Sequence, residues 1–392
     1  MKNRKIALFM LPLLTQGAGA EKYFINLAKN LSDMGNEVVV ITMDEKFFKK
    51  FARLLHIFTH GNFFKKIDVS GREKEADIKN QLGGARWIKS SWGNLKEALN
   101  GYDIIYSKNE LVDLFILKTI DYKKIPPVVV GVHTPIIYPS TGSFMSKLHN
   151  LLYLSFIYKW LLRGAKCIHL SNEFTKKLVD KNFKIKSKKI YYPFSKKYLI
   201  IENNSLELDI KFDNNKINIV FIARLTEQKG INSLVRIVAA IENKKNITDK
   251  IILNIFGSGD HENELKIKNI NDKYSFVRWH GHIENKYVPW ILKKQDFFIT
   301  TAKWETLPFN VLEAQALGLP VIAFDIPGPS DIIEDKKTGY LVKSEDEFIE
   351  KIILLTNNPH LFNNQSIEKN IDDKFNPEKI YEEILNMFNE NI

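Results

Sequence analysis

Two carboxylates eight residues apart are the clearest candidates for chemistry in this sequence. Glu305 and Glu313 flank the segment Thr-Leu-Pro-Phe-Asn-Val-Leu, and the run from Asn310 to Leu317 predicts a helix that stops at Gly318. Glu305 is then expected in the preceding loop and Glu313 in the first helical turn. The backbone N–H groups between them lack helical partners and can hold an anion. A carboxylate on each side suits a nucleotide sugar, which carries hydroxyls at both ends of a diphosphate. The alternative is a helix-dipole role for Glu313 and a solvated Glu305.

A basic pair lies in an earlier loop, Ala-Arg-Leu-Thr-Glu-Gln-Lys-Gly, which follows an apolar run. Arg224 ends that run, and Lys229 with Gly230 opens the next predicted helix. Two cations around such a loop can hold the two phosphates of a nucleoside diphosphate, Arg224 through paired N–H groups and Lys229 as a point charge. In a lysine-rich chain the alternative is two exposed basic residues without a ligand.

Two further candidate segments also follow predicted strands. Gly17 and Gly19, between Thr15 and Glu21, permit close approach of a ligand to the backbone at a helix start. They do not make a full dinucleotide fingerprint, because a lysine occupies the third glycine position. His133 follows a valine-rich run and is placed to reach a ligand, although a lone His at a strand end is more often structural.

Short apolar runs separated by amphipathic stretches predict parallel α/β organisation in both halves of the chain. The strands expected in the first half are 6–10, 37–42, 104–106, 128–132 and 167–170, the last with a buried Cys167. Those expected in the second half are 217–223, 251–257, 276–279, 297–300, 320–324 and 339–342. The expected helices include 23–31, 231–241 and a final amphipathic helix at 377–388.

The length of 392 residues and this order of elements predict two doubly wound domains. The polar, Asn-rich stretch from Ser195 to Lys216 is expected to connect them. We expect an N-terminal domain at 1–195, a C-terminal domain at 196–375, and a last helix at 376–392 that packs back on the first domain. The carboxyl ends of the strands are expected to face a shared cleft, and every candidate segment above falls at such an end.

Composition narrows the class of protein. A net charge of +11 favours an anionic partner, which is a phosphorylated substrate, an anionic lipid or a nucleic acid. The single cysteine excludes an intramolecular disulfide and fits a reducing compartment. No Asp-x-Asp triplet or P-loop occurs, and His280 and His282 are interpreted as a strand end. We therefore expect no metal and no cofactor. Instead, we expect protein cations and helix dipoles to stabilise a leaving group.

The N-terminus imitates a signal peptide, with a basic start, an apolar run at 6–14 and the triplet Ala-Gly-Ala at 18–20. We interpret the run as a first strand, because the following helix and strand complete a β-α-β unit that cleavage would break. No apolar run reaches the roughly 20 residues that a membrane-spanning helix needs, and the best candidate, 148–158, is cut short by Lys147 and Lys159.

Taken in order, these segments resemble those of a retaining glycosyltransferase of family four, which has the GT-B fold of two Rossmann-like domains. The similarity covers nearly the whole chain and is strongest from about Ile217 to Val342. It rests on an ordered set: Gly-Ala-Glu at 19–21, His133, Arg224 with Lys229, Glu305 with Glu313, Pro-Gly-Pro-Ser-Asp-Ile-Ile and Thr-Gly-Tyr-Leu-Val.

The resemblance implies a role for each matched residue. Arg224 and Lys229 would bind the donor diphosphate, and Glu313 would hold the ribose hydroxyls. Glu305 would bind the transferred sugar, and His133 would contact that sugar near the reacting carbon. The catalytic set would thus be His133, Glu305, Arg224 and Lys229. The other donor contacts would come from the Gly19 loop, Ile283 at the base, and Thr306, Leu307, Pro308 and Phe309.

Three departures from the family pattern affect these expectations. Ala18 replaces the first glycine of the N-terminal pair, so closure of that loop is expected to differ. The segment Thr306–Asn310 replaces the commoner Gly-Phe-Gly-Leu, which changes the contacts to phosphate and sugar. Tyr-Pro-Phe-Ser at 192–195 replaces Asn-Gly, which changes the hinge.

A basic aromatic segment at 46–66 is the candidate for the acceptor side. Large apolar residues share one helical face and basic residues line the neighbouring surface, a pattern typical of an interfacial membrane helix. Packing on the N-terminal sheet is the alternative. The segment from Phe144 to Arg163 is more evenly apolar, so we expect it to pack in the core.

We therefore predict a metal-independent, retaining hexosyltransferase. It would move a hexose or N-acetylhexosamine from a nucleotide sugar, UDP favoured over GDP, to a hydroxyl of a glycan or lipid-linked acceptor in cell-surface polysaccharide biosynthesis. The expected location is the cytoplasm, with peripheral contact at the inner face of the plasma membrane through 46–66, and without a nucleic-acid partner.

Two alternatives remain open. A GT-B nucleotide-sugar epimerase would isomerise its substrate without an acceptor, and the ordered Arg–Lys and Glu–Glu set argues against it. A non-catalytic protein that binds anionic lipid or nucleic acid would bind in a salt-dependent way that survives Glu305→Ala.

Overall fold

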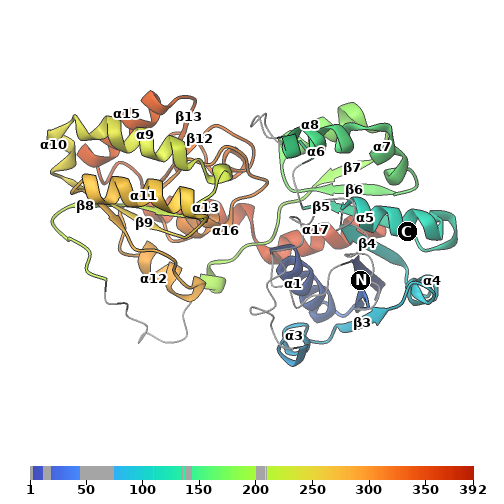
Figure 1. The fold of residues 1–392 in the computed structure, drawn as a ribbon. Coiled ribbons are helices and arrows are strands. Elements are labelled where there is room, and N and C mark those ends of the chain that lie inside the picture. The colour runs from blue at the N-terminus through green and yellow to red at the C-terminus, as the bar shows by residue number, and fades with distance from the viewer. Residues whose placement is uncertain are drawn as a thin grey trace. The chain divides into compact units, whose positions relative to one another are not determined.

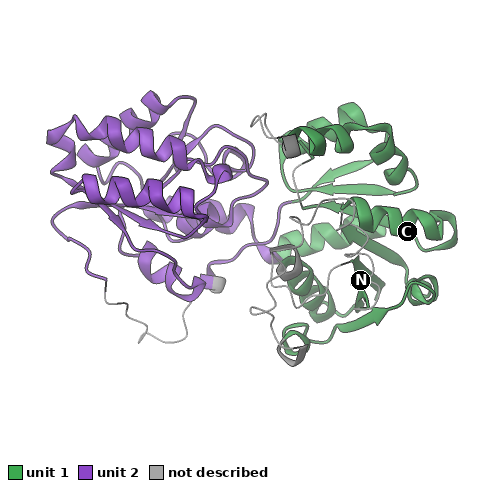
Figure 2. Ribbon diagram, viewed as in Figure 1, with its two compact units in different colours: residues 1–190, 378–392 green, residues 191–377 purple. Residues whose placement is uncertain are grey.

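The computed structural model describes residues 3–11, 19–44, 75–108, 110–133, 136–137, 144–199, 208 and 210–392. The chain divides into two compact units, one of residues 1–190 and 378–392 and one of residues 191–377 (Figure 2). The chain therefore passes between the units twice, first at Ile190–Tyr191 and again at Pro377–Glu378.

Unit 1 is built on a seven-stranded parallel sheet with the order β3-β2-β1-β4-β5-β6-β7 (Figure 1). Its strands are β1 Lys5–Met10, β2 Glu37–Met43, β3 Arg86–Ser90, β4 Ile104–Lys108, β5 Val128–Val132, β6 Cys167–Leu170 and β7 Ser187–Lys189. Its helices are α1 Gly19–Asp33, α3 Glu75–Gln81, α4 Leu95–Leu99, α5 Leu111–Ile120, η2 Tyr122–Lys124, α6 Phe144–Leu154, α7 Phe156–Leu162, α8 Glu173–Asn182 and α17 Pro377–Asn389.

Unit 2 is built on a six-stranded parallel sheet with the order β10-β9-β8-β11-β12-β13. Its strands are β8 Ile217–Ile222, β9 Ile251–Phe256, β10 Val277–Trp279, β11 Phe297–Thr300, β12 Val321–Phe324 and β13 Gly339–Val342. Its helices are η3 Lys196–Leu199, η4 Glu227–Lys229, α9 Ile231–Glu242, α10 Lys245–Thr248, α11 His261–Lys273, η5 Asn285–Tyr287, α12 Val288–Leu292, α13 Phe309–Ala316, α14 Pro329–Ile332, α15 Glu345–Asn357 and α16 Asn364–Lys374.

The central strands are apolar along their whole length because both faces of each sheet are covered. In β1, every residue from Ile6 to Met10 is fully buried. One face of this sheet joins a core cluster that contains Phe9, Leu117 of α5 and Leu161 of α7. On the other face, Tyr106 of β4 contacts Phe24 of α1 and Phe388 of α17. Strands that are covered on both faces appear in the sequence as continuous apolar runs, and these runs predicted the strands.

The predicted α/β organisation is confirmed for every strand that the sequence located, with ends that shift by at most a few residues. Cys167 is buried in β6, as predicted. Two edge strands escaped prediction. The β3 segment Arg-Trp-Ile-Lys-Ser is only partly buried, and the β7 segment Ser-Lys-Lys has no apolar residue. An edge strand that is partly solvated carries little hydrophobic signal.

The prediction of core packing for the segment from Phe144 to Arg163 is wrong in part. Tyr158, Leu161 and Leu162 are buried in the core, but Phe156 and Trp160 on the same helix are exposed. The segment is apolar on two faces, and only one of them meets the sheet. Its sequence does not distinguish the two faces, because both carry large apolar residues.

Candidate functional site

The sheet of unit 2 changes direction between β8 and β11. From β8 the chain moves to β9 and β10 on one side, and it later returns to β11 on the other side. Loops that follow two such strands diverge and leave a crevice at the carboxyl edge of the sheet, where α/β proteins bind ligands. The loop at 223–230 follows β8 and the loop at 301–308 follows β11, so the basic pair and Glu305 meet at this point.

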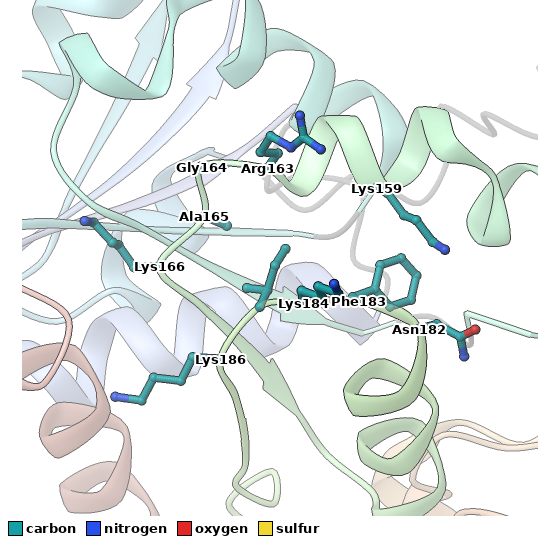
Figure 3. Close-up of a pocket in the computed structure, with 10 residues that line it drawn as sticks. Lys159, Arg163, Gly164, Ala165, Lys166, Asn182, Phe183, Lys184 and Lys186 are labelled. Atoms are coloured by element: carbon teal, nitrogen blue, oxygen red, sulfur yellow. The ribbon is translucent and has the colours of Figure 1, made fainter.

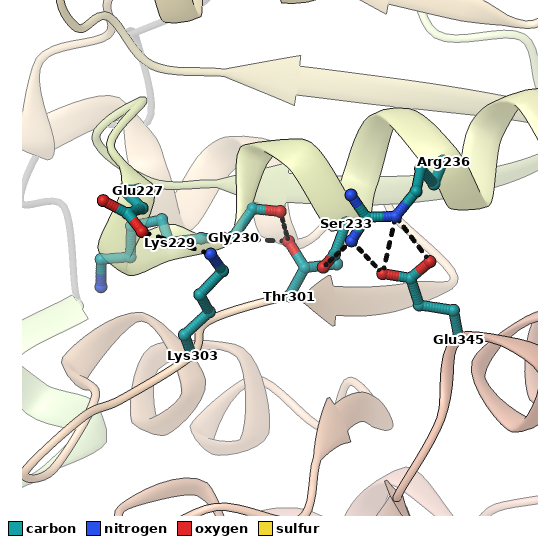
Figure 4. Close-up of polar contacts among 8 residues, drawn as sticks. All are labelled: Glu227, Lys229, Gly230, Ser233, Arg236, Thr301, Lys303 and Glu345. Atoms are coloured by element: carbon teal, nitrogen blue, oxygen red, sulfur yellow. Dashed lines mark hydrogen bonds and ion pairs between the residues drawn. The ribbon is translucent and has the colours of Figure 1, made fainter. Parts of the chain in front are cut away.

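The two loops are joined by a largely buried ion pair between Lys229 and Glu305. The side chains of Lys229 and Glu305 are only 14% and 11% exposed. Thr301 Oγ1 donates hydrogen bonds to the carbonyl oxygens of Lys229 at 2.9 Å and Gly230 at 3.1 Å (Figure 4). Gln228 adds a bond from its side chain to the Trp304 carbonyl at 3.2 Å. These contacts fix the ammonium group of Lys229 in place.

Gly230 is required at this junction. Its φ is +71°, and a Cβ atom there would lie 1.8 Å from the Thr301 carbonyl oxygen. Only glycine combines the left-handed backbone with so close an approach. The sequence singled out Gly230 as a helix start but gave no indication of its partner.

Arg224 lies in the same loop and is exposed. Within the described part of the chain, no carboxylate pairs with its guanidinium. A short parallel bridge joins the next residue, Leu225, to Gly259 after β9, and the Leu225 N–H donates to the Ser258 carbonyl at 2.8 Å. The backbone that carries Arg224 is therefore held while its side chain remains available to an anionic ligand.

Glu313 does not lie in the first helical turn, contrary to the prediction. Helix α13 begins at Phe309, so Glu313 is its fifth residue. Pro308 precedes the helix in an extended conformation, and its carbonyl accepts bonds from the Val311 and Leu312 N–H groups at 3.1 and 3.2 Å. The sequence predicted a helix start at Asn310, one residue too late, because Phe309 was not counted as a helical residue.

Glu313 is partly buried on α13. Burial raises the pKa of this carboxyl to about 7. No described residue offers it a cation or a hydrogen-bond donor, so nothing offsets the loss of water. A carboxylate in this state gains from any ligand hydroxyl that donates to it.

The segment between the two glutamates packs against a glycine from a third loop. Leu307 and Pro308 are buried, whereas Phe309 is about half exposed. A Cβ atom at Gly328, where φ is +94°, would lie 3.0 Å from the Cβ of Glu305 and 3.2 Å from the Thr306 carbonyl oxygen. Gly328 belongs to the Pro-Gly-Pro-Ser-Asp segment, so that motif supports the loop that carries Glu305.

Ile283 follows β10 in the same unit and is partly buried. The loop that leads to it is held to the loop after β9, because the Gly257 N–H donates to the Gly281 carbonyl at 2.7 Å. His280 stacks on Phe256 with ring centroids 4.4 Å apart. Burial lowers the pKa of His280 to about 4, which agrees with its interpretation as a structural residue.

His133 lies in unit 1, directly after β5, beside a buried chain of polar side chains. Its Nε2 is 3.2 Å from the Tyr106 hydroxyl, which is 2.8 Å from His169 Nδ1. His169 Nε2 is 2.9 Å from the Ile190 carbonyl oxygen. Because a carbonyl only accepts, His169 carries its proton on Nε2 and Tyr106 donates to Nδ1. The Tyr106 oxygen then accepts from His133, which places the proton of His133 on Nε2.

Burial keeps both His133 and His169 neutral near pH 7. Loss of water, with the neighbouring His169 and Lys108 as further causes, holds the pKa of His133 well below its ordinary value. Burial lowers the pKa of His169 to about 4. A Cβ atom at Gly131 would lie 2.0 Å from the Tyr106 hydroxyl, so glycine is needed for the chain to form. A neutral His133 can orient a ligand hydroxyl, but it is a poor general acid.

Charged groups are also buried beside β1 and β4, where the sheet of unit 1 changes direction. Lys108 ends β4 and is buried, and Asp113 lies in the first turn of α5. The Leu11 N–H donates to Asp113 at 2.5 Å. Burial raises the pKa of Asp113 to about 7, and Lys108 opposes that rise. Sequence reasoning missed both residues, although charged groups just after an apolar strand could have indicated them.

The structure places the predicted residues in both units. Arg224, Lys229, Ile283, Glu305 to Phe309 and Glu313 belong to unit 2, whereas Gly19 and His133 belong to unit 1. Gly19 is the first residue of α1. The loop before it and the basic aromatic segment at 46–66 lie outside the described residues. Among the described residues, no group of three or more His, Cys, Asp or Glu side chains could hold a metal ion, and no helix could span a membrane.

Solved structures establish the class of fold. Sucrose-phosphate synthase from Thermosynechococcus elongatus superposes with a TM-score of 0.72 and 16% sequence identity, over 99% of each chain. Anabaena Alr3699/HepE, in complex with UDP, gives a TM-score of 0.71 and 15% identity, over 98% of this chain and 100% of that one. The two parallel-sheet units thus form the GT-B fold, as predicted.

Family comparisons identify the sequence family. The model described as Glycosyltransferase Family 4 matches residues 17–192, and the model described as Glycosyl transferases group 1 matches residues 206–372. Together these matches span most of the chain, which belongs to glycosyltransferase family four. The predicted resemblance is confirmed.

Curated relatives match over shorter stretches. The poly(ribitol-phosphate) alpha-N-acetylglucosaminyltransferase of Staphylococcus aureus is 31% identical over 188 residues, which are 45% of this chain and 36% of its own. The UDP-Gal:alpha-D-GlcNAc-diphosphoundecaprenol alpha-1,3-galactosyltransferase of Escherichia coli is 27% identical over 280 residues, 65% of this chain and 66% of its own. The matches thus span about one third to two thirds of these relatives' lengths.

Proposed function

We propose that this protein transfers a hexose or N-acetylhexosamine from a nucleotide sugar to a hydroxyl of a glycan or lipid-linked acceptor in cell-surface polysaccharide biosynthesis. The observation that carries the proposal is the pair of joined loops in unit 2, where Lys229 is held by Glu305 and Arg224 is exposed beside it. Cations that are fixed before charge develops stabilise a leaving group without further reorganisation.

Most contacts to the donor are assigned to unit 2, with His133 and the Gly19 loop of unit 1 as exceptions, and the acceptor is assigned to unit 1. Arg224 and Lys229 bind the diphosphate, and Glu313 accepts hydrogen bonds from the ribose hydroxyls. Glu305 serves the transferred sugar while it orients Lys229. The remaining donor contacts come from the Gly19 loop, Ile283 at the base, and Thr306, Leu307, Pro308 and Phe309.

His133 has a role that follows from its protonation state. Its neutral ring carries a proton on Nε2, toward Tyr106, and we assign this ring to contact the transferred sugar near the reacting carbon. A positively charged ring there would oppose the positive charge that develops on that carbon. Burial therefore suits His133 to positioning rather than to proton transfer.

The reaction retains the anomeric configuration and needs no metal. The bond from the anomeric carbon to the phosphate oxygen breaks, and the acceptor oxygen bonds to the same face of that carbon. The acceptor proton passes to the departing phosphate oxygen. Arg224 and Lys229 neutralise the charge of the nucleoside diphosphate, the task that a divalent ion performs in other enzymes.

Relatives support UDP-sugars as the first donors to test. The Escherichia coli relative is named for a UDP-galactose donor and a diphosphoundecaprenol-linked acceptor. A Streptococcus pneumoniae relative, 30% identical over 135 residues, is named for UDP-N-acetylglucosamine and a peptide acceptor. The two names share the base and differ in sugar and acceptor, so the sugar has to be found by experiment.

The test is release of nucleoside diphosphate from UDP-, GDP- and ADP-sugars, with free and lipid-linked glycans as acceptors and with EDTA. Release from one donor, unaffected by EDTA, is the expected result, and NMR of the product gives its anomeric configuration. Arg224→Ala is expected to lower kcat/KM by about a hundredfold, because a charge-assisted bidentate contact to the leaving group is lost.

Arg236→Ala is the matched control. Arg236 lies on α9, outside the two joined loops, and pairs with Glu345 through two guanidinium nitrogens, at 2.6 and 2.9 Å (Figure 4). Its loss removes an equal charge from unit 2 and is expected to leave kcat/KM within about twofold, since exposed pairs contribute little. Equal losses of kcat/KM in the two variants would contradict the assignment of Arg224. Isomerisation of the donor without an acceptor would show that the protein is an epimerase rather than a transferase.

A further inference from the structure

Helices α5, α6 and α7 of unit 1 expose a contiguous set of large apolar side chains. Phe156 is 80% exposed and Leu151 is 69% exposed. The full set consists of Phe115, Leu151, Leu154, Phe156, Ile157 and Trp160. These residues lie on the outer side of helices whose inner side is already buried, so the core of unit 1 does not require them. Contiguous exposed apolar surface marks a place of contact with another body.

An apolar groove continues this surface inward. It has a volume of about 280 Å³ and lies between α5, α6 and α7. Its lining consists only of Leu111, Val112, Phe115, Leu152, Ile157 and Leu161. A groove with no polar lining suits hydrocarbon better than a hydrated ligand.

A basic pocket of about 530 Å³ adjoins the end of α7 (Figure 3). It lies between the end of α7, the connection into β6 and the connection from α8 to β7. Its cations are Lys159, Arg163, Lys166, Lys184 and Lys186. Lys186 pairs with Glu390 at 3.2 Å, whereas no described carboxylate pairs with the other four. The pocket has no acidic lining residue, so its positive charge is left for an external anion.

The sequence of α6 and α7 is also free of negative charge. No Asp or Glu occurs between Asp121 and Glu173, a stretch that includes all of α6 and α7. Surfaces that face only water usually mix both signs of charge. Apolar side chains that adjoin unpaired cations, on two helices without acidic residues, complement a bilayer of anionic lipid, whose phosphates lie just above its hydrocarbon.

We propose that unit 1 docks on an anionic membrane through this docking face, defined as the six exposed apolar residues named above together with Lys159, Arg163, Lys166 and Lys184. The apolar side chains enter the boundary between headgroups and acyl chains, and the cations bind lipid phosphates. The pocket lies at the amino ends of β6 and β7, the opposite edge of the sheet from His133. The basic part of the docking face therefore lies away from the carboxyl edge of the sheet.

The test is co-sedimentation of the whole protein with vesicles of phosphatidylcholine, alone or mixed with phosphatidylglycerol. Binding to the mixed vesicles that weakens as salt rises is the expected result. Phe156→Ser with Trp160→Ser is expected to lower the partition coefficient at least about tenfold, through lost apolar burial. Lys159→Glu with Lys184→Glu is expected to do the same, since each cation near an anionic surface contributes about fivefold.

Matched controls separate the docking face from general surface properties. Leu265→Ser with Leu361→Ser removes two apolar side chains of unit 2 that are about half exposed, as Trp160 is. Lys268→Glu with Lys293→Glu makes the same change in net charge at exposed sites of unit 2. Both controls are expected to bind within about threefold of the wild type. All of these positions are exposed, so unchanged circular dichroism is expected throughout.

Two results would overturn the proposal. One is a wild-type protein that does not bind anionic vesicles at low salt. The other is binding that persists in both docking-face variants, which would move the membrane contact elsewhere, with the segment at 46–66 as the next place to test.

Discussion

Glu305 and Glu313 show how two carboxylates close in sequence acquire different properties. Glu305 is largely buried, but it forms an ion pair with Lys229. Glu313 is partly buried, no described residue pairs with it as a cation, and loss of water raises its pKa to about 7. Both Glu305→Gln and Glu305→Ala leave the charge of Lys229 uncompensated, which destabilises the fold. Glu305→Gln is the cleaner variant for a test of function, because glutamine keeps the size of the side chain and an oxygen that accepts from the Lys229 ammonium group.

Glu313→Gln is expected to stabilise the protein at pH 8. The pKa of Glu313 is higher in the folded state than in the unfolded state, so protonation favours folding. This contribution is complete below about pH 4.5 and is lost as pH rises to about 7. At pH 8 the wild type keeps an unfavourable buried charge that the variant lacks, a difference of up to about 3 kcal/mol. Chemical denaturation at pH 5 and pH 8 measures it.

The control for this pH effect is Glu350→Gln, on the exposed face of α15. It is expected to change the free energy of unfolding by less than about 0.5 kcal/mol at either pH. A Glu313→Gln variant that is equally destabilised at both pH values would show that the carboxylate has a partner in the folded protein. Under the proposed function, the same variant also weakens donor binding, because the amide is a poorer acceptor for ribose hydroxyls.

Tyr106→Phe tests whether the buried polar chain positions His133. The variant removes the hydroxyl that accepts from His133 and donates to His169. We expect a loss of about 1–3 kcal/mol in stability, because two buried imidazole nitrogens lose a partner. We also expect kcat/KM to fall about tenfold, because the proton of His133 is no longer fixed on Nε2. Nitrogen-15 chemical shifts of the His133 ring report that change directly.

Tyr381→Phe is the control for loss of a buried phenol hydroxyl. Tyr381 is buried on α17 in the same unit and accepts from Asn30 at 3.1 Å. This variant is expected to lose stability without any change in the ring shifts of His133. If Tyr106→Phe kept the wild-type ring shifts of His133 and the wild-type kcat/KM, the hydrogen bonds among His133, Tyr106 and His169 would have only a structural role.

At the scale of elements, Gly230 connects η4, α9 and the loop after β11. Gly230→Ala is expected to destabilise unit 2 by more than about 3 kcal/mol. A left-handed alanine costs about 1–2 kcal/mol by itself, and a Cβ atom 1.8 Å from the Thr301 carbonyl oxygen forces the two loops apart. Urea denaturation measures the stability, and loss of the Lys229–Glu305 contact is expected to weaken donor binding as well.

Gly281→Ala separates strain from collision. Gly281 has nearly the same φ, +73°, but a Cβ atom there meets no atom within 4 Å. We expect this variant to lose only about 1–2 kcal/mol. If the two glycine variants lost equal stability, backbone strain alone would explain Gly230, and the close approach to Thr301 would be unimportant.

The elements that the sequence predicted are those whose residues carry their own signal. Buried parallel strands such as β5 and β11 are apolar runs, and the loops after them contain the candidate residues at fixed offsets. β3 and β7 lie at sheet edges, where solvent replaces one neighbour, so their sequences carry no such run. Helix α13 begins at Phe309 rather than at the predicted Asn310, because the carbonyl of Pro308 accepts the first hydrogen bonds of the helix.

The partners of the site residues could not be predicted, because they come from distant parts of the chain. Thr301 is more than 70 positions from Lys229, and Tyr106 and His169 are brought to His133 by the order of β4, β5 and β6. A sequence position shows that a side chain follows a strand. Only the sheet order shows which other strand ends next to it.

At the scale of the whole molecule, the C-terminal helix returns the chain to unit 1. Glu390, just after α17, pairs with Lys186 and Lys188 of unit 1 at 3.2 and 2.9 Å. The apolar side of α17 is buried there and consists of Ile380, Tyr381, Ile384, Leu385, Met387 and Phe388. The first and last segments of the sequence therefore complete one core, while residues 191–377 form the other unit.

Phe388→Ala is expected to weaken unit 1 selectively. Phe388 is fully buried, and its ring centroid lies 5.8 Å from that of Tyr106, so its truncation opens a cavity beside the chain that positions His133. Such a change costs about 3–5 kcal/mol. Scanning calorimetry is expected to show the transition of unit 1 at a lower temperature while the transition of unit 2 keeps its own. Ile392→Ala, at a half-exposed position beyond the helix, is expected to change neither transition by more than about 0.5 kcal/mol. If Phe388→Ala lowered both transitions equally, the two units would unfold as one cooperative body, and α17 would stabilise the whole chain rather than the core of unit 1.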